Sequence, residues 1–259
     1  MNQTLDLFFN HRSVRVYEKT DIPEHIKEKI FQSMLRGPTA GNGILYSVIE
    51  VKDQEVKEIL AKSCDNQPFI AKAPLVLLVS ADYQRWYDYF MMFNVEQFCE
   101  KEEIPMEKPK EGDLVIALCD AIIAAQTAAI AAESFGIGSC FIGDILEKCE
   151  IHRKLFNLPQ YVFPICLLCL GYPTEQQKNR ELTSRFDEKF IFSKNKYERL
   201  NEEDLKEMFE DRQKQAFGDK EEIQGCKNYA ELTYKQRFGA DFMKERRRSV
   251  KKMIEIWNN

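Results

Sequence analysis

A long apolar stretch, residues 114–135, constrains the fold of this chain more than any other segment. It is long enough to cross a bilayer, but Asp120, Gln126 and Glu133 fall along it, and acidic side chains are costly at membrane depth. We therefore interpret it as a helix that is buried nearly all round, with no membrane span. Its many alanines let neighbouring backbones approach closely, which places such a helix at the centre of a protein or of a dimer.

Length and composition favour a globular protein. The chain has 259 residues, 44% of them hydrophobic, which is enough for a core in one large domain or two small ones. Its formal charge of −5 argues against broad attraction to nucleic acid or to an anionic membrane. Because no basic segment precedes an apolar one at the N-terminus, we expect a cytoplasmic protein with reduced thiols.

The remaining sequence predicts alternating helices and strands. Helices are expected at 4–9, 23–35 and 55–62, and strands at 45–51, 73–81, 139–142 and 162–170. The last strand contains a C-x-x-C pair, which we interpret as buried thiols; no metal site is predicted. Beyond Pro173 the composition becomes charged, yet apolar residues persist at helical spacing. We therefore expect two parts, a core at 1–185 and an ordered arm at 186–259 that packs on the core or on a partner subunit.

A basic run, HRSVR at 11–15, has the chemistry of an anion-binding segment. It places two guanidinium groups, an imidazole and a hydroxyl within five positions. Arginine presents a rigid fork of donors that matches phosphate and keeps its charge at physiological pH. Short basic clusters are also common on solvated surfaces, so the run alone leaves both interpretations open.

Further motifs follow the basic run in a fixed order. They are PTAGN at 38–42, NQPFI at 66–70, AP at 73–74, AD at 81–82, ESFGIG at 133–138, FIGD at 141–144, LP at 158–159 and LGYP at 170–173. This ordered set resembles the FMN-dependent nitroreductase family, and more narrowly its NADPH-preferring major oxygen-insensitive nitroreductase and flavin reductase group. The resemblance implies an α+β fold, a mostly antiparallel mixed sheet flanked by helices with an extended C-terminal arm. It also implies a homodimer that binds FMN at the subunit interface.

The resemblance assigns the phosphate and ribityl end of FMN to the basic run. His11, Arg12 and Ser13 would hold this end, and His11 could do so as a neutral donor or as a cation. Lys178 and Arg180, after the last strand, match a second phosphate-binding pair. Without the family, a solvated loop would be the simpler interpretation of that pair.

The ring of FMN is assigned to other positions. Arg15 would reach the N1 and C2 edge, where the reduced ring is anionic. Gln67 matches an amide that faces the pyrimidine edge, although an exposed polar loop residue is the alternative. Thr39 and Asn42 lie in a glycine-containing loop whose backbone can approach a ligand closely, and they match contacts from the partner subunit.

The segment Ile142, Gly143 and Asp144 matches the backbone that faces flavin N5. Relatives of this group often have a second glycine where this chain has Asp144. If that carboxylate points inward, it disfavours the anionic reduced ring. The alternative, which we favour, is that Asp144 caps a helix starting at Ile145.

The activity implied is hydride transfer from NAD(P)H through flavin N5 to nitroaromatic or related small-molecule acceptors by a ping-pong mechanism. No catalytic side chain is expected, because the cofactor carries the chemistry. Arg237 and the arginines at 246–248 could bind an NADPH 2′-phosphate, or form a solvated basic helix. Open alternatives are an NAD(P)H:flavin or quinone reductase on the same fold, a non-catalytic flavin-binding protein, and an interaction protein that uses the basic segment 235–252.

Overall fold

The computed structural model describes residues 2–259, which form two compact units. The first unit extends to Glu181 and also takes in Glu245–Asn259. The second unit is Leu182–Lys244. The last helix therefore contributes most of its length to the first unit, whereas the expected division assigned all of 186–259 to the arm.

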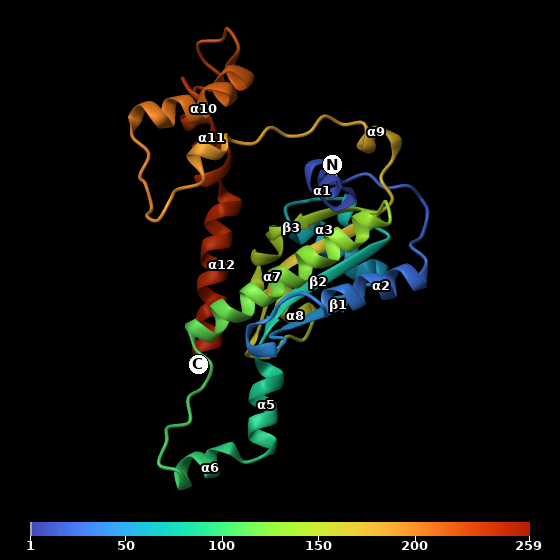
Figure 1. The fold of residues 1–259 in the computed structure, drawn as a ribbon, viewed down its shortest axis with the longest axis vertical. Coiled ribbons are helices and arrows are strands. Elements are labelled where there is room, and N and C mark those ends of the chain that lie inside the picture. The colour runs from blue at the N-terminus through green and yellow to red at the C-terminus, as the bar shows by residue number, and fades with distance from the viewer. Residues whose placement is uncertain (1) are drawn as a thin grey trace. The chain divides into compact units, whose positions relative to one another are not determined.

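A four-stranded sheet lies at the centre of the first unit (Figure 1). Its strands have the order β1-β2-β4-β3, and every pairing among the described residues is antiparallel. They are β1 (Tyr46–Glu50), β2 (Leu75–Asp82), β3 (Gly138–Ile142) and β4 (Val162–Gly171). Because helices and an antiparallel sheet are combined in one unit, the predicted α+β fold is confirmed.

Helices cover both faces of this sheet. Strand β2 is buried along its whole length, and its alternate residues reach two different clusters. Leu75, Leu77 and Val79 pack with helices α2 (Glu24–Met34) and α7 (Glu111–Ser134), which lie side by side in Figure 1. Val76 and Leu78 pack with α3 (Gln54–Ser63) and α4 (Phe69–Lys72) on the other face. A strand that is buried on both faces has a continuous apolar sequence, as β2 has.

Helix α7 is the apolar stretch that dominates the sequence. Within residues 2–259 it is the one helix long and apolar enough to cross a membrane, by length and composition only. Six of its alanines lie buried against the sheet and α2: Ala121, Ala124, Ala125, Ala128, Ala129 and Ala132. The prediction that this helix is buried nearly all round is wrong for the single chain. One of its faces is exposed, at Val115, Ile116, Cys119 and Ile122.

Several helices were not predicted, chiefly because they are short or lie in polar sequence. In the first unit these are α4, α8 (Cys149–Leu155) and α9 (Glu175–Lys178). They also include α5 (Gln84–Met92) and α6 (Val95–Lys101), which extend away from the sheet in Figure 1. Helix α1 is Gln3–Phe9, as expected. The second unit contains α10 (Glu202–Phe217) and α11 (Tyr229–Thr233), so the helical spacing of apolar residues in this segment corresponds to helices.

The C-terminal helix α12 (Asp241–Asn258) is anchored in the first unit by its last turns. Met253 and Trp257 are buried with Tyr161 and Phe163. The indole Nε1 of Trp257 donates to the carbonyl of Lys110 at 3.0 Å. The predicted apolar spacing of this helix therefore corresponds to a buried face.

Candidate functional site

The basic run is fixed between the ends of two strands. The backbone N–H of Val14 donates to the carbonyl of Ser139 in β3 at 2.8 Å, and Val14 is buried. Gly138 allows this approach, since a Cβ there would lie 2.3 Å from Val14 Cγ2. Tyr17 forms an isolated bridge with Pro173, just beyond β4. The sheet therefore presents the run as extended chain along its edge.

The structure brings the two predicted cationic clusters together. Arg180 Nη2 donates to the carbonyl of Ser13 at 2.7 Å. Arg12 Nη1 donates to the carbonyl of Lys178, and the N–H of Arg15 donates to Gln177 Oε1 at 3.2 Å. Segments more than 160 positions apart in sequence thus share one site, where Arg12 and Arg180 each bind the backbone of the other segment. The ammonium of Lys178 is paired with Glu175.

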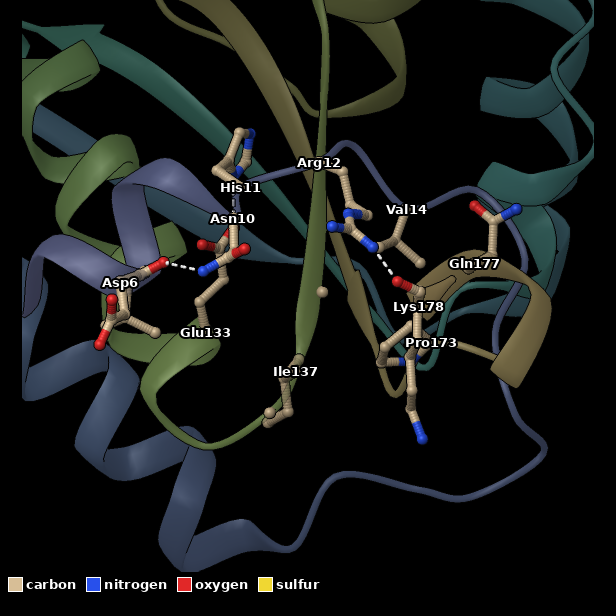
Figure 2. A pocket seen from close by; sticks show the side chains of 13 residues that line it. Asp6, Asn10, His11, Arg12, Val14, Glu133, Ile137, Pro173, Gln177 and Lys178 are labelled. Carbon is tan, nitrogen blue, oxygen red and sulfur yellow. Dashed lines mark hydrogen bonds and ion pairs between the residues drawn. The ribbon is translucent and has the colours of Figure 1, made fainter. Parts of the chain in front are cut away.

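A cavity of about 470 Å³ opens beside this junction, between α1, the end of α7 and the chain after β4 (Figure 2). Arg12 reaches across it toward the backbone of Lys178. The Nε of Arg12 is buried and has no hydrogen-bond partner within residues 2–259. Buried guanidinium donors are normally satisfied, so this unpartnered nitrogen is unusual, while the charge of the guanidinium as a whole favours an anion in the cavity.

His11 lies on the wall of the same cavity and is paired with an acid. Its Nδ1 is 2.5 Å from Glu133 Oε1, to which Ser139 Oγ also donates at 3.3 Å. The predicted phosphate contact of His11 therefore stays a prediction, but its side chain is already oriented by the end of α7.

Arg15 and Arg180 converge on strand β3. The guanidinium carbon of Arg15 lies 5.9 Å from the centre of the Phe69 ring. Burial raises the pKa of the Cys140 thiol, while Arg15 and Arg180 act in the opposite direction because both charges are close to it. A thiol with a raised pKa is a poor nucleophile, so Cys140 contributes packing at this position.

Gln67 is connected to Asp144 and through it to the C-terminal helix. Gln67 Nε2 donates to Cys64 O at 2.9 Å and to Asp144 Oδ2 at 2.7 Å. Asp144 Oδ1 is paired with Arg246 of α12, which also reaches Glu147 Oε1 at 3.1 Å. Burial, followed by the nearby Asp144, raises the pKa of Glu147. Arg246 thus binds two carboxylates within the first unit.

The interpretation of Asp144 as a helix cap is wrong. The chain forms a short 3-10 helix at Gly143–Leu146 with Ile142 at its N-cap, and in the described chain no side chain caps it. The carboxylate is instead taken by the Gln67 amide and the Arg246 guanidinium, because a charged donor and an amide are stronger partners than a single backbone N–H.

Ile142 and Gly143 end strand β3 and lead into this 3-10 helix. Ile142 is buried, whereas a Cβ built on Gly143 would meet no atom within 4 Å. The backbone at Gly143 is therefore open to a flat ligand. Within residues 2–259, no group of three His, Cys, Asp or Glu side chains is arranged to hold a metal ion.

Thr39 and Asn42 lie in a separate loop, which is held by Asp120 of α7. Thr39 Oγ1 donates to Asp120 Oδ2, and the N–H groups of Ala40 and Leu45 donate to the same carboxylate at 3.0 and 3.1 Å. No hydrogen bond or ion pair within residues 2–259 links Thr39 or Asn42 to the basic run. Their assignment to a partner subunit's site stays a prediction.

Asp120 is a functional residue that sequence reasoning missed. It is 2% exposed and accepts hydrogen bonds from three donors of the loop at 39–45. From the sequence, Asp120 was interpreted only as evidence against a membrane span. The signal that could have found it is an acid in the middle of an alanine-rich helix. A buried carboxylate needs hydrogen-bond donors, and loops rich in unpaired N–H groups supply them.

Comparisons with known proteins agree with this geometry. Residues 9–172 match the model of the Nitroreductase family. A relative named FMN reductase [NAD(P)H] from Bacillus subtilis (strain 168) is 31% identical over 180 residues, 70% of each chain. A CR(VI) reductase from Pseudomonas sp. (strain G-1) is 28% identical over 243 residues, covering 94% of this chain and 93% of the relative.

The same fold is present among solved structures. That of NfrA2 from B. megaterium matches with a TM-score of 0.75 and 25% sequence identity over 98% of both chains. The family model alone covers more than half of the chain, including the basic run, the sheet and the turn after β3. The chain therefore belongs to the nitroreductase family.

Proposed function

We propose that this protein is an FMN-dependent oxidoreductase that uses NAD(P)H to reduce nitroaromatic or related small acceptors. The observation that carries the proposal is the meeting of the basic run at 11–15 with Lys178 and Arg180 at the start of β3, together with the open backbone at Gly143 after the end of the same strand. Cations of this kind match the phosphate and the anionic ring edge of a reduced flavin. The names of the relatives, FMN reductase and CR(VI) reductase, belong to the same reaction class.

The phosphate end of the cofactor would be held by cations from both clusters. His11, Arg12 and Ser13 supply donors from the basic run, and Lys178 and Arg180 supply two positive charges from the segment after β4. The side chain of Arg12 lines the cavity, so its guanidinium charge lies close to a phosphate bound there. We therefore assign the residues of this junction to the phosphate and ribityl group.

The ring end would be held by Arg15, Gln67 and the turn at 142–144. Arg15 stabilises negative charge at the N1 and C2 edge, and the open backbone at Gly143 leaves room for the ring. When it is bound, FMN supplies hydride transfer from NAD(P)H to the acceptor in a ping-pong cycle. The chain itself orients the ring and excludes water, and no protein nucleophile is required.

We further propose that the protein is a cytoplasmic homodimer with FMN at the subunit interface. The support is the exposed apolar face of α7, which a single chain leaves in water. Thr39 and Asn42 would then contact the flavin of the partner subunit. In this arrangement residues 1–185 form the cofactor-binding core, and 186–259 extend it over the core or the partner.

The visible absorption of the purified protein tests the cofactor and the reaction together. We expect a yellow protein whose flavin band bleaches with NADH or NADPH and returns on adding a nitroaromatic. An Arg15→Ala variant should retain less FMN, because the ring edge loses its cation. A colourless wild type that is not reconstituted by added FMN would contradict the proposal.

The same assay separates the alternative functions. Faster reoxidation by free FMN or a quinone than by nitroaromatics would favour a flavin or quinone reductase, an alternative supported by the relative named FMN reductase. Flavin that is bound but never bleached would indicate a non-catalytic flavin-binding protein. Each outcome is read from one absorbance trace with one enzyme preparation.

The second unit contains a basic cavity that suits the 2′-phosphate of NADPH. The cavity, of about 390 Å³, is lined by Arg185, Arg212 and Arg237 together with hydroxyl side chains. A hydrogen bond with Thr233, followed by the effect of Arg212 and Arg237, lowers the pKa of Tyr229 on its wall. Positive potential inside a cavity of this size is typical of phosphate-binding sites.

We therefore expect Arg237→Ala to raise KM for NADPH roughly tenfold, because one charge-assisted contact to the 2′-phosphate is lost. KM for NADH, which has no 2′-phosphate, should stay unchanged. Arg199→Ala is the matched control, since Arg199 is an exposed arginine of the same unit outside the cavity. Equal changes in KM for both nucleotides would contradict the assignment.

A further inference from the structure

We propose that Asp144 is a positioning residue that holds the Gln67 amide in one orientation, so that Gln67 selects a ring with an N–H donor. The inference rests on the proposed function, because the ring in question is the flavin. It goes beyond that function in naming which groups of the ring are recognised.

The orientation of the Gln67 amide follows from the chemistry of its neighbours. Its side chain faces a backbone carbonyl, Cys64 O at 2.9 Å, and a carboxylate oxygen, Asp144 Oδ2 at 2.7 Å. Both neighbours are acceptors, so the amide nitrogen must face them with its two hydrogens. The opposite orientation would place three oxygens together. Assignment of amide oxygen and nitrogen from such a network is the standard criterion.

The carbonyl oxygen of Gln67 is left as the group that a ligand meets. Both hydrogens of Nε2 are used within the chain, and Oε1 accepts no hydrogen bond from residues 2–259. The side chain is only partly buried, so Oε1 is available. A fixed acceptor binds a donor and repels an acceptor. On the pyrimidine edge of a flavin the donor is N3–H, which lies between two carbonyl groups.

The backbone at this position is fixed as well. Asp65 and Asn66 both have left-handed conformations, with φ of 55° and 51°, immediately before Gln67. The N–H of Gln67 donates to Ala61 O at 2.7 Å, which ties the turn to helix α3. Left-handed residues that are not glycine cost energy and are found where the surroundings determine them. The turn therefore presents Gln67 from a defined position.

Asp144 is in turn held by the C-terminal helix. Its second oxygen is paired with Arg246 of α12, so the carboxylate does not rotate freely and its charge is compensated. Arg246 also reaches Glu147, at 3.1 Å. A bare carboxylate beside the ring would disfavour its anionic reduced form, whereas a paired one does so much less. The contacts from Arg246 through Asp144 to Gln67 thus connect helix α12 to the residue that faces the ring edge.

Asp144→Asn is the variant that tests the orientation without changing the volume. Arg246 has donors only, so it takes the remaining oxygen of the new amide and turns its NH2 group toward Gln67. Gln67 Nε2 then loses one acceptor. In spectra of the full chain with 15N-labelled glutamine side chains, we expect both Gln67 protons to exchange slowly in the wild type. In Asp144→Asn at least one should exchange fast, with or without FMN.

Binding of two flavins tests the selection. The probes are FMN and N3-methyl-FMN, in which a methyl group replaces the N3 hydrogen. We define the preference as the Kd for N3-methyl-FMN divided by the Kd for FMN, and we expect the wild type to prefer FMN. Asp144→Asn should bind FMN roughly tenfold more weakly, and its preference should fall by about the same factor. Gln67→Ala has no side-chain amide, so any preference that it still shows for FMN comes from the size of the methyl group alone. Asp144→Asn should approach that value.

Glu150→Gln is the matched control. Glu150 of α8 accepts from Arg248 of α12 at 2.8 Å. Glu150→Gln therefore also breaks an ion pair with α12, but one that does not include Asp144 or Gln67. Its flavin preference should equal that of the wild type. The proposal is overturned if Gln67→Ala lowers the preference while Asp144→Asn keeps it. If the wild type binds neither flavin, the proposed function fails, and the exchange of the Gln67 protons still decides the orientation.

Discussion

A chain carrying Ile122→Arg is expected to be a monomer that holds no FMN. Ile122 is 42% exposed on helix α7, on the same face as Val115 and Cys119. These positions are four and three residues apart, so they form one stripe. At the centre of a symmetric interface, the new guanidinium would meet its own copy without a counter-charge. Burying such a pair costs several kcal/mol, so we expect the dimer affinity to fall at least 100-fold.

The loss of FMN follows from the proposed sharing of the site. If Thr39 and Asn42 act on the flavin of the partner subunit, separating the subunits removes part of each site. Sedimentation velocity over a range of protein concentrations gives the assembly state, and the ratio of flavin to protein absorbance gives the occupancy. We expect both to fall together in Ile122→Arg.

Ile151→Arg is the control for a new charge on an exposed isoleucine. Ile151 is 46% exposed and lies on α8, outside the α7 stripe. This variant should stay dimeric and yellow. Two results would contradict the expectation: an Ile122→Arg protein that is still a dimer, or a monomer that retains full FMN occupancy. The second result would place the whole flavin site within one chain.

Much of the fold could be predicted because its elements have strong local patterns. Strand β2 is a continuous apolar run because both of its faces are buried, and α7 is rich in alanine because it packs closely on the sheet and α2. The basic run and Lys178 were predicted as one site from their motifs, and the structure joins them through Arg12. The helices and strands follow from local patterns, whereas the pairing of the basic run with Lys178 came from the family resemblance, because without it a solvated loop was the simpler interpretation of that segment.

Other features could not be predicted, because they depend on contacts between distant residues. The partner of Asp144 is Arg246, about 100 positions later, and nothing near Asp144 in the sequence identifies it. A cap was the natural interpretation, since aspartate before a helix usually forms one. The exposed stripe of α7 was missed for a related reason. Its apolar residues have the same composition as the buried face, so only the packing separates the two.

Replacing Asp120 with alanine should lower the free energy of unfolding by about 3 kcal/mol or more. The carboxylate accepts from Thr39 Oγ1 and from the N–H groups of Ala40 and Leu45. The N–H of Leu45 is in a buried residue, and a buried donor left without a partner costs about 1–3 kcal/mol, while losing the two part-buried bonds adds about 0.5–1.5 kcal/mol each. Asp120→Asn should also destabilise the protein, because its NH2 group would face N–H donors. Both variants loosen the loop at 39–45, so its backbone amides should exchange faster with solvent.

Thermal unfolding of the FMN-loaded and FMN-free proteins measures this effect. A loss of 3 kcal/mol corresponds to a fall in Tm of about 6–12 °C for a protein of this size. Glu58→Ala is the control, since Glu58 is an exposed carboxylate of helix α3, outside the α7 stripe, and the Tm of this variant should change little. A Tm of Asp120→Ala within about 2 °C of the wild type would mean that water replaces the carboxylate at this site. In that case the loop at 39–45 would not depend on α7 for its conformation.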